Sequence, residues 1–224
     1  MSRLELVVFD WDGTLSDSAA RIVTTMQLAF REHDLEPPAD ETVRRVVGLG
    51  LEIAVARLAP QLDATKQRQL VATYRKVYFT DAVPASPLFA GAYETVAALA
   101  DAGYLLAVAT GKGRSGLEHG LSESGLGEFF AVTRCADETR SKPHPQMLNE
   151  ILTDLDTVAA RAVMVGDTEF DLEMAHAAGT HAAAVTYGVH PLERLLASSP
   201  HLVVDHIESL PGALSDYAEQ EPAR

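Results

Sequence analysis

The apolar run at residues 4–9 is the first element that the sequence predicts. It is short, contains adjacent valines and has no helix cap inside it, which is typical of a strand buried in a parallel sheet. The run stops at Asp10, and Gly13 permits a turn shortly afterwards. We therefore expect a central strand whose carboxyl end carries a polar turn.

A long helical stretch follows this strand. Apolar positions recur at three- and four-residue steps from residue 17 to about residue 33, until Pro37 and Pro38 break the pattern. Residues 40–80 again have helical spacing, in two or three pieces. Because no strand-like run occurs between residues 19 and 84, we expect an all-helical insert there.

Downstream of Pro84 the pattern changes. Short apolar runs alternate with helical segments, which is typical of βαβ units and a parallel sheet. The predicted strands cover residues 104–109, 129–133, 162–165, 181–185 and 202–204, and the predicted helices cover residues 91–102, 113–123, 145–154, 169–178 and 207–217. The chain is therefore predicted to be an α/β core that is interrupted, after its first strand, by a helical domain.

Composition and charge exclude several classes of protein. Of the 224 residues, 47% are hydrophobic and 22% are charged, as in globular proteins and unlike collagen-like or disordered chains. The net charge of −14 would repel phosphate backbones and anionic lipid, so we expect neither a nucleic-acid nor a membrane partner. The apolar runs are far shorter than a membrane span, and we expect no signal peptide.

The single cysteine, Cys135, cannot form an internal disulfide, which fits a reducing cytoplasm. We expect Cys135 to behave as a small hydrophobic residue. The eight histidines show no ligand spacing with it, so we expect no zinc site.

Aspartates directly follow two of the predicted strands. Asp10 and Asp12 come after the first strand, and Asp167 and Asp171 come after the strand at residues 162–165. In an extended backbone the first two point to one side, and the other two share a face at the start of a helix. Since ligands bind at the carboxyl ends of parallel strands, we expect an all-oxygen site there, which suits Mg²⁺ better than Zn²⁺.

Each of these aspartates also has an ordinary structural interpretation, as a turn residue or a helix cap. The string from Asp10 to Thr14 favours the functional interpretation over the structural one. Four fixed residues of the type Asp-x-Asp-Gly-Thr match by chance at roughly one position in 10⁵. Over a chain of this length a chance match is on the order of one in 10³. We therefore interpret the string as a functional motif.

The segment from Phe9 to Leu15 resembles the first motif of the haloacid dehalogenase-like hydrolases, most of which are Mg²⁺-dependent phosphatases. Three further segments resemble the other motifs of that family in the same order, at Thr110, at residues 142–145 and at residues 166–171. The resemblance covers nearly the whole chain. It implies a Rossmann-like parallel sheet core at residues 1–16 and 85–224. The insert at residues 17–84 resembles the α-helical cap domain of the phosphoglycolate phosphatase-like branch.

This resemblance implies a role for each acidic residue. Asp10 would be the nucleophile that forms an aspartyl-phosphate, and Asp12 would act first as general acid and then as general base. Mg²⁺ would be bound by Asp10, by the backbone carbonyl of Asp12 and by Asp167, while Asp171 would orient these ligands. Dehalogenases of the superfamily, and typically its phosphonate-cleaving branch, lack the second aspartate. The presence of Asp12 therefore favours phosphate-ester hydrolysis or phosphoryl transfer.

Phosphate contacts are expected from Thr110, Gly111 and Lys142. The segment from Gly111 to Gly113 opens a predicted helix, whose first backbone N–H groups favour a phosphate. Pro143 keeps Lys142 off a helix, at the place of the phosphate-binding lysine in the family. Lys112 is a weaker candidate, because a solvated lysine at a helix start is the ordinary interpretation.

In the cap, Arg44 and Arg45 would suit an acidic substrate tail. Two solvated helix arginines fit the sequence at least equally well. The expected activity is Mg²⁺-dependent hydrolysis of a small phosphomonoester of the phosphoglycolate type, by a monomer or homodimer.

Two alternatives to this activity stay open. A phosphomutase of the β-phosphoglucomutase type has the same four motifs, so the motifs do not separate it from a phosphatase. A regulatory binding protein with an inactive core is the other alternative. It is disfavoured because all the motif residues are intact.

Overall fold

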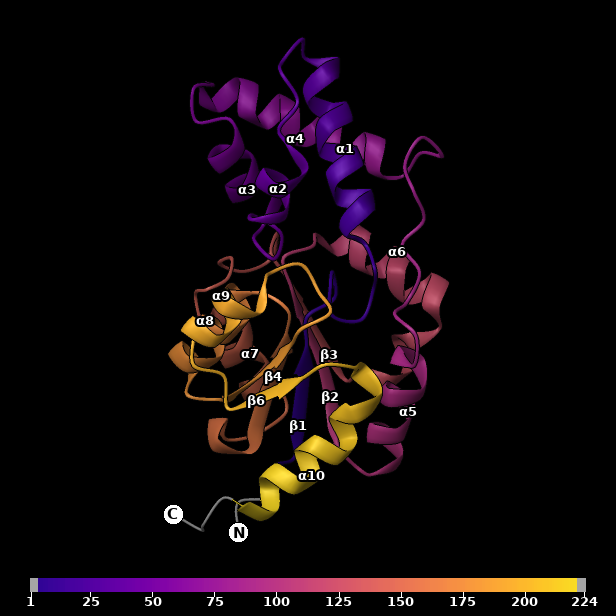
Figure 1. Ribbon diagram of the computed structural model, residues 1–224, viewed down its shortest axis with the longest axis vertical. Helices are drawn as coiled ribbons and strands as arrows, with labels where there is room; N and C mark the ends of the chain where they lie inside the picture. The colour runs from indigo at the N-terminus through magenta and orange to yellow at the C-terminus, as the bar shows by residue number, and fades with distance from the viewer. Residues whose placement is uncertain (1–3, 221–224) are drawn as a thin grey trace.

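The computed structural model describes residues 4–220, and a six-stranded sheet in the order β3-β2-β1-β4-β5-β6 forms its centre (Figure 1). All neighbouring strands are parallel. The strands are β1 (Leu6–Phe9), β2 (Leu105–Thr110), β3 (Val132–Cys135), β4 (Ala162–Gly166), β5 (His181–Val185) and β6 (Leu202–Val204). The predicted α/β class with a parallel sheet core is confirmed.

Strand β1 lies in the middle of the sheet because its residues are all apolar and all buried. Its last residue, Phe9, pairs with Val108 of β2 and with Val165 of β4. The backbone N–H of Asp10 donates to the carbonyl of Val165 at 2.9 Å, which holds Asp10 against the sheet. The residues that follow β1, β2 and β4 therefore meet at one edge of the sheet.

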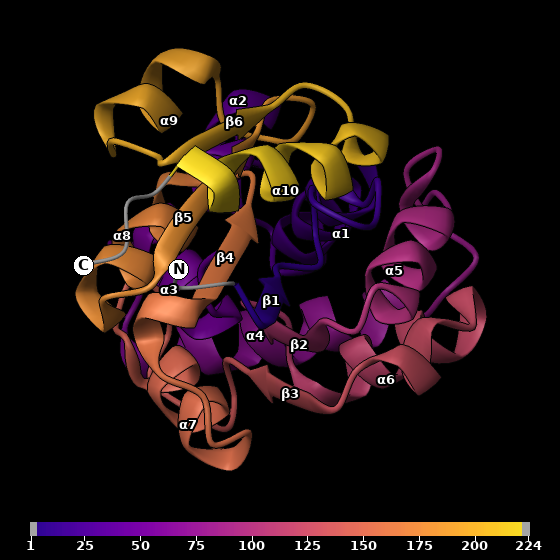
Figure 2. The ribbon, with the colours of Figure 1, turned by 90° about the horizontal axis from the view of Figure 1, so that it is seen from below.

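Helices cover both faces of the sheet (Figure 2). Val7 and Phe9 point into the layer on one face, and Leu6 and Val8 point into the layer on the other. This alternation is the side-chain period of a strand, and it explains why an unbroken apolar run forms a strand buried on both sides. The first layer contains α5 (Ala92–Asp101), α6 (Arg114–Ser124) and α10 (Leu210–Gln220), and the second contains α7 (Gln146–Asp154), α8 (Glu169–Ala178) and α9 (Leu192–Ala197).

Four further helices lie beyond the carboxyl edge of the sheet (Figure 1). They are α1 (Ala19–Glu32), α2 (Asp40–Arg44), α3 (Leu51–Leu58) and α4 (Ala64–Tyr78), and we call them, with the loops between them, the cap. The cap has a hydrophobic core of its own, to which α1 contributes Val23, Met26 and Phe30. These residues stand at the three- and four-residue spacing that predicts an amphipathic helix.

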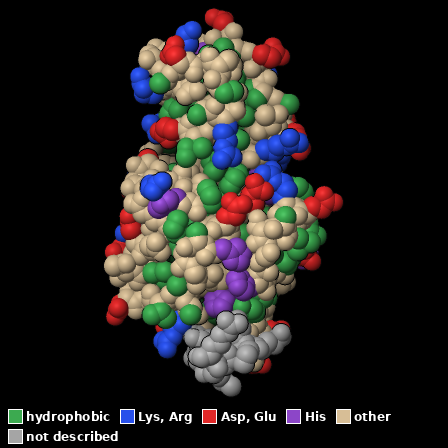
Figure 3. Space-filling view, turned by 90° about the vertical axis from the view of Figure 1, so that its left-hand side faces the viewer, with side chains coloured by type: hydrophobic (Ala, Val, Ile, Leu, Met, Phe, Trp, Pro, Cys, Tyr) green, Lys and Arg blue, Asp and Glu red, His purple; other side chains and the backbone are tan. Residues whose placement is uncertain are grey.

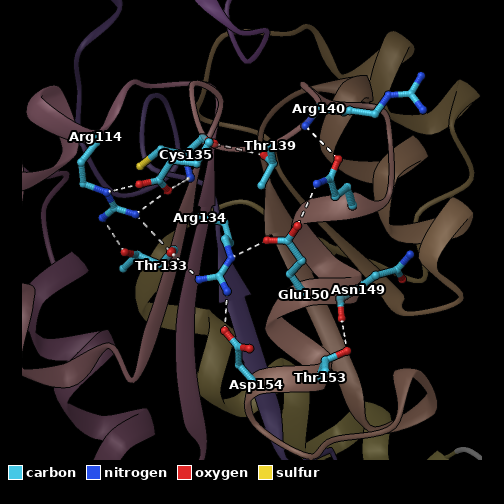
Figure 4. A network of polar contacts seen from close by, with 12 residues as sticks. Arg114, Thr133, Arg134, Cys135, Thr139, Arg140, Asn149, Glu150, Thr153 and Asp154 are labelled. Atoms are coloured by element: carbon cyan, nitrogen blue, oxygen red, sulfur yellow. Dashed lines mark hydrogen bonds and ion pairs between the residues drawn. The ribbon is translucent and has the colours of Figure 1, made fainter.

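Strand β3 differs from its predicted position. It lies at Val132–Cys135 instead of residues 129–133, because Leu126–Phe129 form a 3₁₀ helix after the left-handed Gly125. Two arginines then stabilise the strand (Figure 4). Arg114 of α6 donates to Thr133 at 2.7 Å, and Arg134 pairs with Glu150 of α7 at 2.7 Å. Because β3 is an edge strand, its polar side chains can reach both neighbouring helices.

Helix α9 is absent from the sequence-based prediction because it is only six residues long and follows Pro191 directly. The predicted last helix begins as a 3₁₀ turn at Ile207–Ser209, and another 3₁₀ turn, Ala159–Arg161, precedes β4. Over the described part of the chain, no helix combines the length and the apolar character that crossing a membrane requires.

Candidate active site

A cavity of about 110 Å³ lies between the carboxyl edge of the sheet and the cap. Its core side includes Asp10, Asp12, Thr110 and Gly111, and its other side is formed by residues of all four cap helices. The structure therefore brings together the residues of the first two predicted motifs. Lys142 and Asp171, from the other two motifs, do not line the cavity. Lys142 contacts both Asp10 and Asp171.

Lys142 links Asp10 to the helix after β4. Its ammonium nitrogen lies 2.7 Å from Oδ1 of Asp10 and also donates to Oδ1 of Asp171, and the side chain is almost fully buried. Burial alone would lower the pKa of Lys142, but the two carboxylates raise it above its ordinary value. Burial raises the pKa of Asp10 to about 7, although Lys142 acts in the opposite direction. Lys142 is therefore a fixed cation that compensates Asp10 only in part.

Asp171 orients this lysine while it caps α8. Its Oδ2 accepts hydrogen bonds from the backbone N–H of Thr168 at 3.1 Å and from the Thr168 hydroxyl at 2.6 Å. Since Lys142 occupies Oδ1, both oxygens of Asp171 have partners. These contacts fix Asp171 beside Lys142, and its role in orienting the metal ligands stays a prediction from the sequence.

Asp167 is enclosed by two glycines. A Cβ atom on Gly13 would lie 2.2 Å from Oδ2 of Asp167, and one on Gly188 would lie 2.1 Å from its Cβ. Gly13 also has a φ of +87°, which favours glycine. The Asp-x-Asp-Gly-Thr string therefore needs its glycine for two reasons: the turn after β1 and the close approach of Asp167.

A divalent cation fits the carboxylates of this site. Within residues 4–220, the sole cluster of three metal-ligating side chains is Asp10, Asp167 and Asp171, with one oxygen from each within 4.8 Å of the others. Oδ2 of Asp10 is buried and has no hydrogen-bond partner. Burial and the two neighbouring carboxylates raise the pKa of Asp167 well above its ordinary value. An all-oxygen donor set with an unpaired buried acceptor suits Mg²⁺.

A second buried lysine contacts Asp12. The ammonium nitrogen of Lys112 lies 3.0 Å from Oδ1 of Asp12 and donates to the Tyr78 hydroxyl at 2.8 Å. Burial alone would lower the pKa of Lys112, but Asp12 and Tyr78 raise it above its ordinary value. The interpretation of Lys112 as a solvated lysine is therefore wrong, since its side chain is only 8% exposed. Its position between two glycines after Thr110 was the available signal, whereas nothing local singles out Tyr78.

Thr110 and Gly111 lie where the core meets the cap. Thr110 is buried, and its Oγ1 accepts a hydrogen bond from the backbone N–H of Lys112 at 3.1 Å. A Cβ atom on Gly111 would lie 2.5 Å from the carbonyl oxygen of Gly48 in the cap. Gly111 therefore permits a backbone contact between the two parts of the chain, while the N-cap position of α6 is occupied by Gly113.

Comparison with known proteins gives the family. The sequence signature of the haloacid dehalogenase-like hydrolases matches residues 7–185. This chain is a haloacid dehalogenase-like hydrolase. The probable phosphatase IndB of Dickeya dadantii is 37% identical over 214 residues, which cover 93% of this hydrolase and 92% of IndB. The pyrophosphatase PpaX of Bacillus cereus is 30% identical over 215 residues, which cover 96% of this hydrolase and 98% of PpaX.

Solved structures show the same fold. The crystal structure of a predicted phosphoglycolate phosphatase from Haemophilus somnus matches this hydrolase with a TM-score of 0.85 at 23% identity. The match covers 93% of this chain and 97% of the other. The Rossmann-like architecture predicted from the sequence is therefore shared with other members of the family.

The two cap arginines proposed from the sequence do not line the cavity of this hydrolase. Arg44 and Arg45 lie at the end of α2, and the Arg45 side chain is 64% exposed and 3.3 Å from Glu41. Among the described residues, the cationic side chains that line the cavity are Lys112 and Arg75. A contact of Arg44 or Arg45 with substrate remains a prediction from the sequence.

Cys135 and the histidines lie outside this site. Cys135 is buried at the end of β3, and burial raises the pKa of its thiol to about 12. Several histidine side chains gather on one face of the hydrolase (Figure 3). The ring centroid of His201 lies 5.4 Å from that of His176 and 5.2 Å from that of His181. These rings do not form a three-ligand metal cluster in the part of the chain that the structure describes.

Proposed function

We propose that this hydrolase is a Mg²⁺-dependent phosphatase that cleaves small phosphomonoesters through an aspartyl-phosphate on Asp10. The observation that carries the proposal is a pair of carboxylates facing one cavity, each beside its own buried lysine. Asp10 lies 2.7 Å from Lys142, and Asp12 lies 3.0 Å from Lys112. Two carboxylates that differ in their surroundings suit a nucleophile and a general acid-base group. The relatives include a probable phosphatase and a pyrophosphatase, which supports the reaction class.

The reaction consists of two displacements at phosphorus. A carboxylate oxygen of Asp10 attacks phosphorus while the bond to the ester oxygen breaks, and Asp12 donates a proton to the departing alkoxide. Asp12 then accepts a proton from water as the water oxygen attacks the aspartyl-phosphate. The bond between phosphorus and Asp10 breaks, and inorganic phosphate leaves. Thr110 and the N–H of Gly111 would bind the phosphate oxygens, and Lys142 holds Asp10 in place.

Asp10, Asp167 and the backbone carbonyl of Asp12 would bind Mg²⁺. When bound, the ion supplies positive charge that lets an anionic carboxylate approach an anionic ester. Asp171 would contribute by orienting Lys142, whose ammonium group donates a hydrogen bond to its Oδ1.

The substrate in this proposal is a small phosphorylated metabolite, and the family resemblance makes 2-phosphoglycolate one compound to test. We propose residues 17–84 as the cap domain and residues 1–16 and 85–224 as the core. We further propose that the enzyme acts in the cytoplasm as a monomer or homodimer. A phosphomutase of the β-phosphoglucomutase type would use the same residues, but its product would be an isomerised sugar phosphate instead of free phosphate.

The proposal is tested by phosphate release from p-nitrophenyl phosphate and a panel of small metabolite phosphates, with Mg²⁺ and with EDTA. We expect release only with Mg²⁺. The variant Asp10→Asn should lose turnover and keep a normal melting curve. Retained activity, or a large loss of stability, would contradict the assignment of Asp10 as nucleophile. No release from any compound would favour the regulatory binding protein, and an isomerised sugar phosphate would favour the mutase.

A further inference from the structure

The cap side of the cavity is apolar. The core side carries the carboxylates and the phosphate-binding groups, whereas the cap side contributes mainly aliphatic and aromatic side chains. The part of a substrate that extends from the phosphate toward the cap would contact these side chains. They include Ile22, Met26, Val43, Val47, Leu51 and Tyr74.

The cations in the lining are already paired. Lys112 contacts Asp12 at 3.0 Å, and Arg75 contacts Glu52 at 2.6 Å. Glu52 itself lines the cavity, so an anion approaching Arg75 would also meet a carboxylate. Among the described lining residues, Asp10, Asp12, Glu52 and Asp137 are acidic, and Lys112 and Arg75 are the basic ones.

Two further cap arginines, Arg45 and Arg57, are directed elsewhere. Arg45 is exposed and pairs with Glu41, and the guanidinium of Arg57 lies 5.6 Å from the Phe170 ring centroid. Neither belongs to the lining. A second anionic group on the substrate would therefore find no unpaired cation among the described side chains of the cavity, and burying its charge there would be unfavourable.

We propose, building on the phosphatase function above, that the alcohol released by this enzyme is small, uncharged and largely apolar. Each methylene placed against the cap wall strengthens binding by about fourfold. A carboxylate or a second phosphate at the same place loses its hydration without gaining a cation. The lining thus selects against phosphoglycolate and pyrophosphate, and for simple alkyl phosphates of similar size.

Isobutyl phosphate and 2-phosphoglycolate form a matched pair for the test. They have the same heavy-atom skeleton, and an isopropyl group in one replaces the carboxylate carbon and oxygens of the other. We expect kcat/KM for isobutyl phosphate to exceed that for 2-phosphoglycolate by about tenfold or more. Equal values, or a preference for 2-phosphoglycolate, would overturn the proposed substrate class and leave the phosphatase function intact. No hydrolysis of either compound or of p-nitrophenyl phosphate would remove the phosphatase function itself.

A variant pair tests the role of the cap wall. Leu51→Arg places a cation at a half-buried lining position, and Leu51→Gln removes the same apolar contact without adding charge. We expect Leu51→Arg to shift the ratio of the two kcat/KM values toward 2-phosphoglycolate by about tenfold. Leu51→Gln should reduce hydrolysis of isobutyl phosphate without raising that of 2-phosphoglycolate. If Leu51→Arg melts normally and leaves the ratio unchanged, the wall does not contact the substrate and the proposal is wrong.

Discussion

The ammonium group of Lys112 lies 3.0 Å from Oδ1 of Asp12, and the two side chains are almost completely buried. The hydroxyl of Tyr78, at the end of the last cap helix, accepts a hydrogen bond from the same ammonium group at 2.8 Å. The ammonium nitrogen also lies 4.5 Å from the centre of the Tyr78 ring. A residue of the cap therefore helps to position the cation that contacts the proposed general acid.

Replacing Lys112 should slow the step that depends on the acid. When Asp12 gives up its proton, the carboxylate that forms is stabilised by Lys112. Loss of such a charged hydrogen bond costs about 1.5–3 kcal/mol, so Lys112→Ala should lower kcat/KM for alkyl phosphates by roughly 10- to 100-fold. For p-nitrophenyl phosphate the loss should be smaller, because its leaving group departs without a proton. An equal loss for both substrates would mean that Lys112 does not act through Asp12. Tyr78→Phe keeps the ring and should have a milder effect.

Mg²⁺ should stabilise the protein through Asp167. A ligand at 100 times its Kd stabilises the folded state by about 2.7 kcal/mol, which corresponds to a rise in Tm of roughly 5–10 °C for a chain of this size. We expect such a rise between EDTA and MgCl₂ for the natural protein. Asp167→Asn should abolish the rise, because it removes the negative charge that would attract the ion beside Asp10 and Asp171. A full Mg²⁺-dependent shift in Asp167→Asn would exclude Asp167 as a ligand.

A methyl group at Gly111 should disturb the contact between cap and core. The new Cβ would lie 2.5 Å from the carbonyl oxygen of Gly48, and this backbone atom can move only with the cap. We expect Gly111→Ala to lower kcat/KM by more than tenfold while the melting curve stays near that of the natural protein. Gly113→Ala is the matched control, because its Cβ would meet only the movable side chain of Asp137 at 2.9 Å. Similar losses in the two variants would argue against a special role for the Gly111 contact.

Cys135 should be nearly inert in the folded protein. Burial raises the pKa of its thiol from 9.0 to about 12, so the thiolate fraction near pH 8 falls by about a thousandfold. The reaction with a disulfide reagent should therefore be very slow in the native state and fast in urea. The rate in urea is the internal control for an intact thiol. A fast native reaction would show that the end of β3 opens readily.

The sequence predicts the core of this fold better than its edges. β1 is predictable because an apolar run without caps has few alternatives, and its alternate residues do enter both helix layers. The edge strand β3 is misplaced because its residues are half polar and Arg114 and Arg134 stabilise it through partners that are distant in sequence. Helix α9 is too short for its periodicity to be recognised.

In the candidate site, residues within local sequence motifs are predictable, and contacts between distant segments are not. The acidic residues stand in local strings, so Asp10, Asp12, Asp167 and Asp171 can be singled out before their arrangement is known. The arrangement itself arises from β1 and β4 being neighbours in the sheet. Tyr78 could not be found this way, because its contact with Lys112 depends on how the cap rests on the core. A contact between the cap and the core does not show in the hydrophobic periodicity of either segment.

Gly48 and Gly111 bring main-chain atoms of the cap and the core close together, beside the side-chain contacts of Lys112 with Tyr78 and of Ser141 with Gly50. The contact between Gly48 and Gly111 does not involve the side chains of Val47 or Leu51. Substitutions at positions such as Leu51 or Val47 can alter what the cavity accepts while the two layers still meet at the same place. A change of substrate then needs replacements in the cap wall alone, with the carboxylates and lysines of the core left as they are.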